Sequence, residues 1–215
     1  MKLDALLVGQ NTSASKPSEA MRAAVLAELD VAKVCSWRAD VVRVVASSWL
    51  LVLGVAGVLL AGGAISVSHL AGRAPNILGL MGLAAAFSFV AIAPRQRGRV
   101  SLALGVGAVA MIGLVFARQT GQVSALPQWV CSLSHLAVAA GPLAFGMSLL
   151  RHSAVSAPRA ALLGLAVGTT GAILGELACD QGWSHVAIFH VGAWVVIAVV
   201  AAVVSRRIVP RSFAP

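Results

Sequence analysis

The chain has 215 residues, of which 59% are hydrophobic and only 11% are charged. A water-soluble domain of this size needs a polar surface, so the composition excludes a soluble globular protein and predicts one that crosses a membrane several times. The net charge is +9, but tyrosine is absent and other aromatic residues are few, so side chains that could stack on bases are scarce and direct nucleic-acid binding is not expected.

Residues 1–43 form the longest stretch outside the apolar runs, and we expect a short cytosolic segment with helical structure. Ser18 is a predicted N-cap, and apolar residues follow at helical spacing: Met21, Val25, Leu26 and Leu29. Charged side chains lie mostly off this stripe, so the helix is amphipathic. Two interpretations remain open: the helix lies on the membrane or the bundle, or it docks into a groove of a cytosolic partner.

Six apolar runs follow, each with roughly the 17–25 residues that a helix needs to cross a ~30 Å hydrocarbon layer. Backbone groups find no water partners there, so helix is the expected conformation. The sequence therefore predicts an all-α polytopic membrane protein, with a six-helix transmembrane bundle over residues 44–205 and a cytosolic tail over 206–215. The runs lie near 44–66, 76–93, 100–117, 129–150, 160–178 and 186–205.

The positions of the basic residues predict the orientation of this bundle. Fourteen of the sixteen Lys and Arg residues lie in the N-terminal segment, the second and fourth connections and the C-terminal tail. Arg73 and Arg118 lie on the opposite side. Because cytoplasmic loops carry an excess of Lys and Arg, we expect both termini in the cytoplasm and the protein in a bacterial inner membrane.

Four glycines recur along the fifth run at a spacing of three or four residues: Gly164, Gly168, Gly171 and Gly175. They predict a smooth ridge on which a neighbouring helix packs closely.

Polar residues gather where the fourth run begins and the fifth run ends, on the side that this orientation places outside. Cys131 and Cys179 lie at the outer ends of two antiparallel neighbouring helices, so we expect their thiols at similar depth. His135 lies one turn inward from Cys131, and Glu176 lies one turn inward from Cys179. The next stretch adds further oxygen and imidazole donors: Asp180, His185 and His190.

Thiol, imidazole and carboxylate groups are ligands of Zn or Cu, and two facing cysteines are equally a disulfide pair. We therefore expect a redox- or metal-sensing site made of Cys131, Cys179, His135, Glu176 and His190. The candidate ligands of Zn or Cu are Cys131, His135, Glu176 and Cys179. The residues leave open whether the cysteines form a disulfide or bind metal.

Several further residues accompany the two cysteines and the glycines: Pro142, Leu149, Leu150, Arg151, Pro158, Phe189, His190 and Gly192. This pattern resembles the NrsF-type membrane anti-sigma factors, six-helix proteins of bacteria. In size and layout the chain is also similar to CarR-like anti-sigma factors of light-induced carotenoid responses. The opening Asp4, Leu6 and Leu7 are similar to the acidic and hydrophobic start of many members.

The resemblance implies that the cytosolic segment holds an extracytoplasmic-function sigma factor at the membrane. An outward-facing signal, which is a metal, an oxidant or light-derived reactive oxygen, would release it. Two extracytoplasmic cysteines are implicated in the response of this family, and Cys131 and Cys179 occupy those positions. The expected partner-binding residues are Asp4, Leu6, Leu7, Met21, Val25, Leu26 and Leu29.

A membrane thiol oxidoreductase, or a protein that binds or transports metal, is the alternative that uses the same residues. The sequence holds no Cys-x-x-Cys motif and no second cysteine pair to relay electrons. The polar donors gather at one end, and none of the helices carries a polar stripe through its centre. We therefore expect a signalling protein and not an enzyme.

Overall fold

The computed structural model describes residues 18–21, 23, 37–93, 96–117, 127–150 and 156–207. The chain divides into two units, Met1–Cys35 and Ser36–Pro215. In the first unit residues 19–21 are helical, and the Ser18 hydroxyl oxygen accepts a hydrogen bond from the Met21 N–H at 3.2 Å, which confirms the predicted N-cap. The other expected partner-binding residues lie outside the described ranges: Asp4, Leu6, Leu7, Val25, Leu26 and Leu29.

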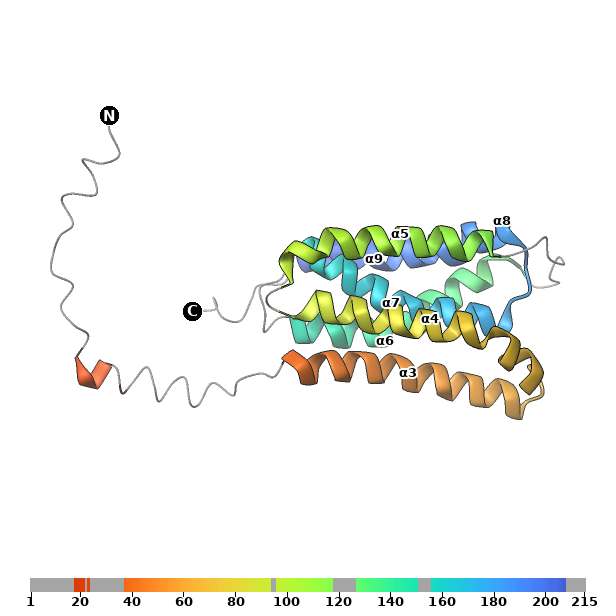
Figure 1. Ribbon diagram of the computed structural model, residues 1–215, viewed down its shortest axis with the longest axis horizontal. Helices are drawn as coiled ribbons and strands as arrows, with labels where there is room; N and C mark the ends of the chain where they lie inside the picture. The colour runs from red at the N-terminus through yellow and green to blue at the C-terminus, as the bar shows by residue number, and fades with distance from the viewer. Residues whose placement is uncertain are drawn as a thin grey trace, which may run out of the picture. The chain divides into compact units, whose positions relative to one another are not determined.

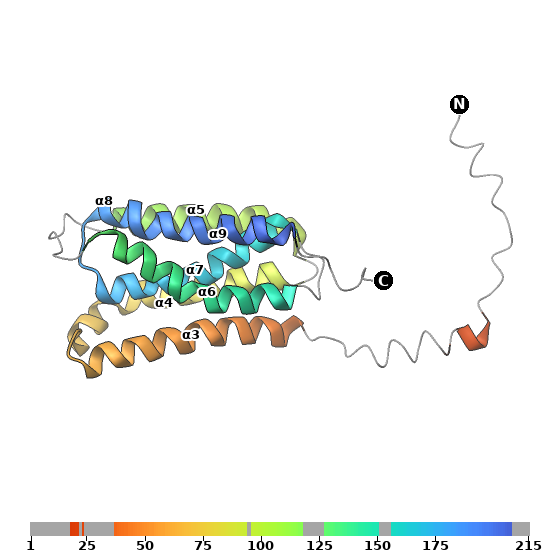
Figure 2. The same cartoon turned by 180° about the vertical axis from the view of Figure 1, so that it is seen from behind.

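The second unit is a bundle of antiparallel helices (Figures 1 and 2). The connections α3–α4 and α7–α8 lie at one end, which we call the cysteine end; α3 begins and α9 ends at the opposite, terminal end. The elements in chain order are α3 (Trp37–Ala61), α4 (Val67–Ile92), η2 (Arg97–Arg99), α5 (Val100–Phe116), α6 (Trp129–Leu150), α7 (Ala157–Ala178), α8 (Trp183–His185), η3 (Val186–Val191) and α9 (Gly192–Ser205).

Five spans in the described part of the chain are long and apolar enough to cross a membrane: α3, α4, α6, α7 and the continuous stretch Trp183–Ser205. The apolar α5 is shorter, and its 17 residues reach the lower limit of the range of about 17–25 that a crossing needs. Large apolar side chains such as Leu50, Val58 and Phe116 are exposed on the outside of the bundle, as lipid-facing residues would be. The expected all-α polytopic membrane fold is confirmed.

Two helices begin earlier than the apolar runs predicted. α3 starts at Trp37, seven residues before the run, because Asp40 in its first turn is buried and pairs with Arg43 at 3.0 Å. α4 starts at Val67, where the hydroxyl of Ser66 accepts the His69 N–H at 3.1 Å. Pro75 was expected in a loop but lies inside α4, since neighbouring helices can satisfy the backbone group that a proline frees.

Helix α7 is the centre of the bundle. Nearly all its side chains are buried, and it packs against α9, α4 and α6 and also touches α3 and α5. The predicted glycine ridge is confirmed: a Cβ at Gly164 would lie 2.6 Å from Ala198 Cα, and one at Gly168 would collide with the ring of Trp194. The Trp194 indole N–H donates to the Leu165 carbonyl at 2.7 Å, so α9 is fixed on α7.

A buried arginine joins α7 to α4 at the terminal end. Arg159, only 2% exposed, donates from Nε to the Ala91 carbonyl at 2.7 Å and from Nη2 to the Ile92 carbonyl at 2.8 Å. These carbonyls belong to the last turn of α4, and the last carbonyls of a helix have no partner within the helix. One of the basic residues used to predict the orientation therefore also caps a helix.

Candidate functional site

Two thiols from neighbouring helices meet at the cysteine end. Cys131 lies in the first turn of α6 and is half-buried, and Cys179 is the C-cap of α7 and is buried. The backbone N–H of Cys179 donates to the Gly175 carbonyl at 3.0 Å, which sets its position at the end of the helix. Both cysteines are thiols in this structure.

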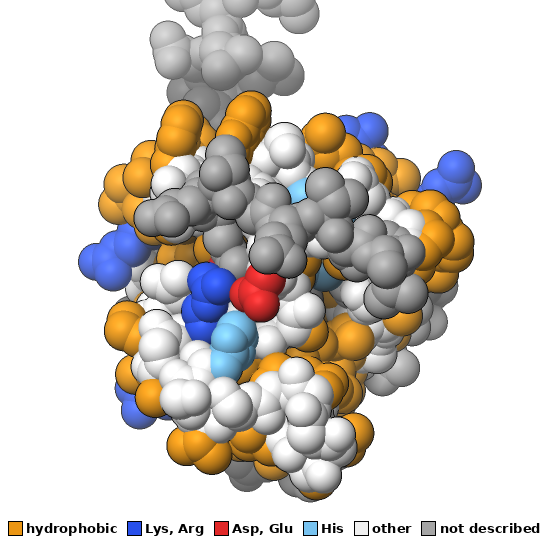
Figure 3. Space-filling model, turned by 90° about the vertical axis from the view of Figure 1, so that its right-hand side faces the viewer, with side chains coloured by type: hydrophobic (Ala, Val, Ile, Leu, Met, Phe, Trp, Pro, Cys, Tyr) orange, Lys and Arg blue, Asp and Glu red, His pale blue; other side chains and the backbone are white. Residues whose placement is uncertain are grey.

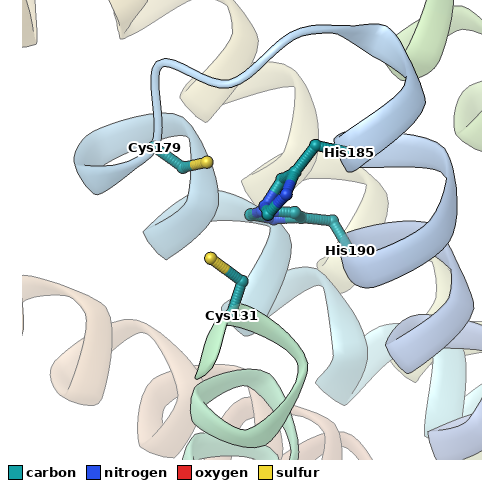
Figure 4. A group of neighbouring side chains, drawn as sticks. All are labelled: Cys131, Cys179, His185 and His190. Atoms are coloured by element: carbon teal, nitrogen blue, oxygen red, sulfur yellow. The ribbon is translucent and has the colours of Figure 1, made fainter. Parts of the chain in front are cut away.

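Two imidazoles face these thiols. The sulfur atoms of Cys131 and Cys179 and one ring nitrogen each from His185 and His190 all lie within 4.8 Å of one another. Figure 4 shows the two sulfurs and both rings pointing toward a common space between α6, the end of α7 and the start of the last span. We call these four residues the Cys-His cluster.

The local backbone explains how both histidines reach the same space. Residues five apart in an α-helix point about 140° away from each other. Here η3 is a π-helix, in which the hydrogen bonds run from i to i+5, so residues five apart lie nearly above one another. His185 immediately precedes η3 and His190 lies within it, so the π-turn turns both imidazoles toward the thiols.

His135 stands behind His190 and contacts the cluster through it. The His135 Nε2 lies 2.9 Å from the His190 Nδ1, and the two rings meet edge to face with centroids 4.7 Å apart. Two ridge glycines make room for these rings, since a Cβ at Gly171 would collide with His135 and one at Gly175 would collide with His190. His135 is therefore next to the cluster but is not one of its four converging donors.

Glu176 is buried and turned toward α4. Its carboxylate accepts a hydrogen bond from the Asn76 side chain at 3.2 Å and lies 3.5 Å from the Arg73 guanidinium. Arg73 also pairs with Asp180 at 3.1 Å, and the surface at this end shows a basic side chain against an acidic one (Figure 3). Glu176 of the expected site and the neighbouring Asp180 thus both pair with Arg73, and the structure does not bring either acid to the four converging donors.

A bacterial relative matches this chain over its whole length. It is 41% identical over 217 residues to the carotenogenesis protein CarR of Myxococcus xanthus, and the match covers 100% of this chain and 98% of that protein. The chain belongs to the CarR family. No family model and no solved structure matches it. The CarR-like resemblance, expected from the size and layout of the chain, is confirmed, and it extends through the N-terminal segment.

In this CarR-family protein an apolar cavity of about 230 Å³ opens beside the thiols. Its walls come from four elements: α3 with Val55 and Leu59, α6 with Cys131 and His135, the end of α7 with Cys179, and η3 with His190. The cavity leaves space next to both sulfur atoms for an ion or a small molecule.

His185 is the donor that the expected site of this CarR-family chain left out. His185 and His190 are five residues apart, a spacing that puts two side chains on different faces of an α-helix or of a strand. If this segment were α-helical throughout, the two rings would therefore point in different directions. A polar pair at this spacing next to a helix start is the one signal that could have indicated a π-turn. The pairing of Arg73 and Asn76 with Glu176 had no local signal, because α4 and α7 are about a hundred residues apart in sequence.

Proposed function

We propose that this protein is a membrane-embedded anti-sigma factor that negatively regulates transcription. It would hold an extracytoplasmic-function sigma factor at the cytoplasmic face of a bacterial inner membrane and release it when the cysteine end receives an envelope signal. The observation that carries this proposal is the 41% identity to the carotenogenesis protein CarR along the whole chain. The genes under its control would then include those of a light or stress response.

The charge distribution supports an outward-facing cysteine end. Arg73, which is one of the two basic residues on that side, is balanced by Glu176 and Asp180. Other basic residues lie toward the terminal end, among them Arg38 in the first turn of α3 and Arg206, which follows α9. The positive-inside rule then directs the terminal end to the cytoplasm, where a sigma factor is available.

The N-terminal segment is the proposed docking element. Met21, the first residue of the apolar stripe, is 61% exposed next to the Ser18 cap. Sigma factors are helical, and an amphipathic helix binds such proteins by laying its apolar face into a hydrophobic groove. The remaining members of the stripe would extend the same face.

The bundle offers a route between the two ends. The Cys-His cluster joins the start of α6, the end of α7 and the start of the last span, so an event there changes how these helices are held together. Small shifts of packed helices are a common way to carry a switch across a domain. We propose signalling and not catalysis, since the chain holds no second cysteine pair to which electrons could pass.

Replacing Leu26 and Leu29 together with Asp tests the docking element. The two charges disrupt the apolar stripe, so we expect the sigma factor to be lost from the purified full-length protein and its regulon to be switched on at unchanged membrane abundance. The matched control replaces Ala23 and Ala27 with Asp, which adds the same charge to the opposite face and should leave co-purification intact. Normal repression by the Leu26 and Leu29 variant would assign the stripe to the bilayer or the bundle.

A further inference from the structure

We propose that Cys131, Cys179, His185 and His190 bind one Zn²⁺ ion in tetrahedral coordination. This inference rests on the proposed function only in that the site would be where the envelope signal is received. The set differs from the ligands expected from sequence, because His185 and His190 take the places of His135 and Glu176.

The donor set and its spacing fit this ion. Two cysteines and two histidines are a common tetrahedral zinc set, with Zn–S near 2.3 Å and Zn–N near 2.0–2.1 Å, so that bound ligand atoms lie about 3.3–3.8 Å apart. The four donor atoms here already lie within 4.8 Å of one another. Side-chain movements on the order of 1 Å bring them to coordination distance.

The surroundings of His185 point to a bound ligand. Its side chain is 5% exposed, yet neither ring nitrogen has a hydrogen-bond partner among the described residues. A buried imidazole without partners is costly, and buried polar groups in folded proteins are nearly always satisfied. The ring packs on Phe189 with centroids 5.0 Å apart, which holds it toward the thiols, and a bound ion would satisfy one of its nitrogens.

The surroundings resemble the supporting shell of a metal centre. Histidines that bind metal usually engage a second group through their other nitrogen, which fixes the ring. His135 contacts the His190 Nδ1 at 2.9 Å, so we assign Nε2 of His190 to the ion and treat His135 as a positioning residue. The Ser132 hydroxyl donates to the Phe189 carbonyl at 2.8 Å and ties α6 to η3 between the ligands.

Charge balance favours Zn²⁺ over a monovalent ion. On binding, each thiol gives its proton to water and forms one S–Zn bond, and each neutral imidazole donates a lone pair. The product, two thiolates and one divalent cation, is neutral, which suits a buried position. With Cu⁺ the same donors would leave a net negative charge, and the acids nearby already pair with Arg73.

The test loads the reduced full-length protein, in a Cys35→Ser background, with Zn²⁺ or with Co²⁺ as a spectroscopic probe. We expect about one ion per chain, about two protons released per Zn²⁺, and thiolate-to-cobalt charge transfer with tetrahedral d–d bands. Each of Cys131→Ser, Cys179→Ser, His185→Ala and His190→Ala should lose the tetrahedral spectrum. His69→Ala and Glu176→Gln are controls from the same end and should keep it.

The role of His135 gives a separate readout. His135→Ala should retain the tetrahedral spectrum but weaken Zn²⁺ binding by about 10–100-fold, as loss of a supporting group does. Equal elution volume and membrane abundance for every variant exclude misfolding as the cause of a lost signal. A variant that fails this check is replaced by His185→Gln or His190→Gln.

Two results would overturn the proposal. The first is unchanged Zn²⁺ affinity in His185→Ala and His190→Ala, and the second is tighter binding of Cu⁺ that needs only the thiols. Sigma-factor co-purification from the same preparations separates this test from that of the proposed function. A wild-type chain that binds Zn²⁺ and no sigma factor refutes the anti-sigma function alone; a chain that binds the sigma factor and no Zn²⁺ refutes the metal site alone.

Discussion

Gly171 and Gly175 show how single residues without side chains determine the chemistry of this bundle. Each leaves the space that an imidazole occupies, His135 in one case and His190 in the other. Their spacing along α7 matches that of Gly164 and Gly168, which instead admit α9 and Trp194. The glycines of α7 therefore allow α9 to pack closely toward the terminal end and leave room for two imidazoles toward the cysteine end.

Gly175→Ala should weaken Zn²⁺ binding at the Cys-His cluster more than it lowers the stability of the fold. The added methyl group collides with His190, and overpacking of this kind costs about 1–3 kcal/mol. We expect a lower midpoint of thermal unfolding in detergent together with weaker Zn²⁺ binding. Gly79→Ala is the matched control, because a Cβ there meets no atom within 4 Å, and it should leave both measurements unchanged. Full Zn²⁺ affinity in Gly175→Ala would show that His190 can shift freely.

At the scale of elements, η3 is the part of the fold that could not be predicted from hydrophobicity. Apolar runs revealed six helical segments because lipid demands apolar side chains and internal hydrogen bonds. They missed the starts of α3 and α4, where Asp40 and Pro75 look like breaks but lie within helices. The cysteines could be placed together from antiparallel connectivity alone. The place of His185 beside them could not be predicted, since it depends on one extra residue in a helical turn.

Deletion of Ile188 tests the role of that turn. The residue is 65% exposed, so its loss removes little packing, but it should convert η3 to α-helix and rotate the preceding residues by about 100° relative to α9. We expect unchanged helical content by circular dichroism and loss of the tetrahedral Co²⁺ spectrum. Ile188→Ala keeps the residue count and should retain the spectrum. An intact site in the deletion variant would mean that the π-turn is not needed to bring the histidines together.

At the scale of the whole molecule, the two ends differ in chemistry. The cysteine end holds two thiols, clustered imidazoles and an arginine balanced by acids. The terminal end holds the Arg159 cap and the basic residues that begin and follow the bundle. This difference between the two ends agrees with the proposed relay of an external event to a cytoplasmic partner.

Reporter fusions check the orientation that this polarity predicts. Fusions after Gln122 and Gln181 should report the periplasm, and fusions after Gln96 and Val155 should report the cytoplasm, because basic residues concentrate at the second set of connections. Paired alkaline phosphatase and green fluorescent protein reporters give opposite readings at each site. A cytoplasmic signal at Gln122 would reverse the orientation and contradict an outward-facing Cys-His cluster.

The hydrogen bond from Trp194 to Leu165 has a mechanical consequence. It fixes the last span on α7, so we expect it to resist a rotation of α9 that begins in η3. Helix α6 differs from α9, because it carries Cys131 and contains Pro142. It also borders open space on two sides, which are the cavity of about 230 Å³ beside the thiols and a groove of about 590 Å³ against α3. Among the described helices, we therefore expect α6 to respond most to an event at Cys131, with a bend near Pro142.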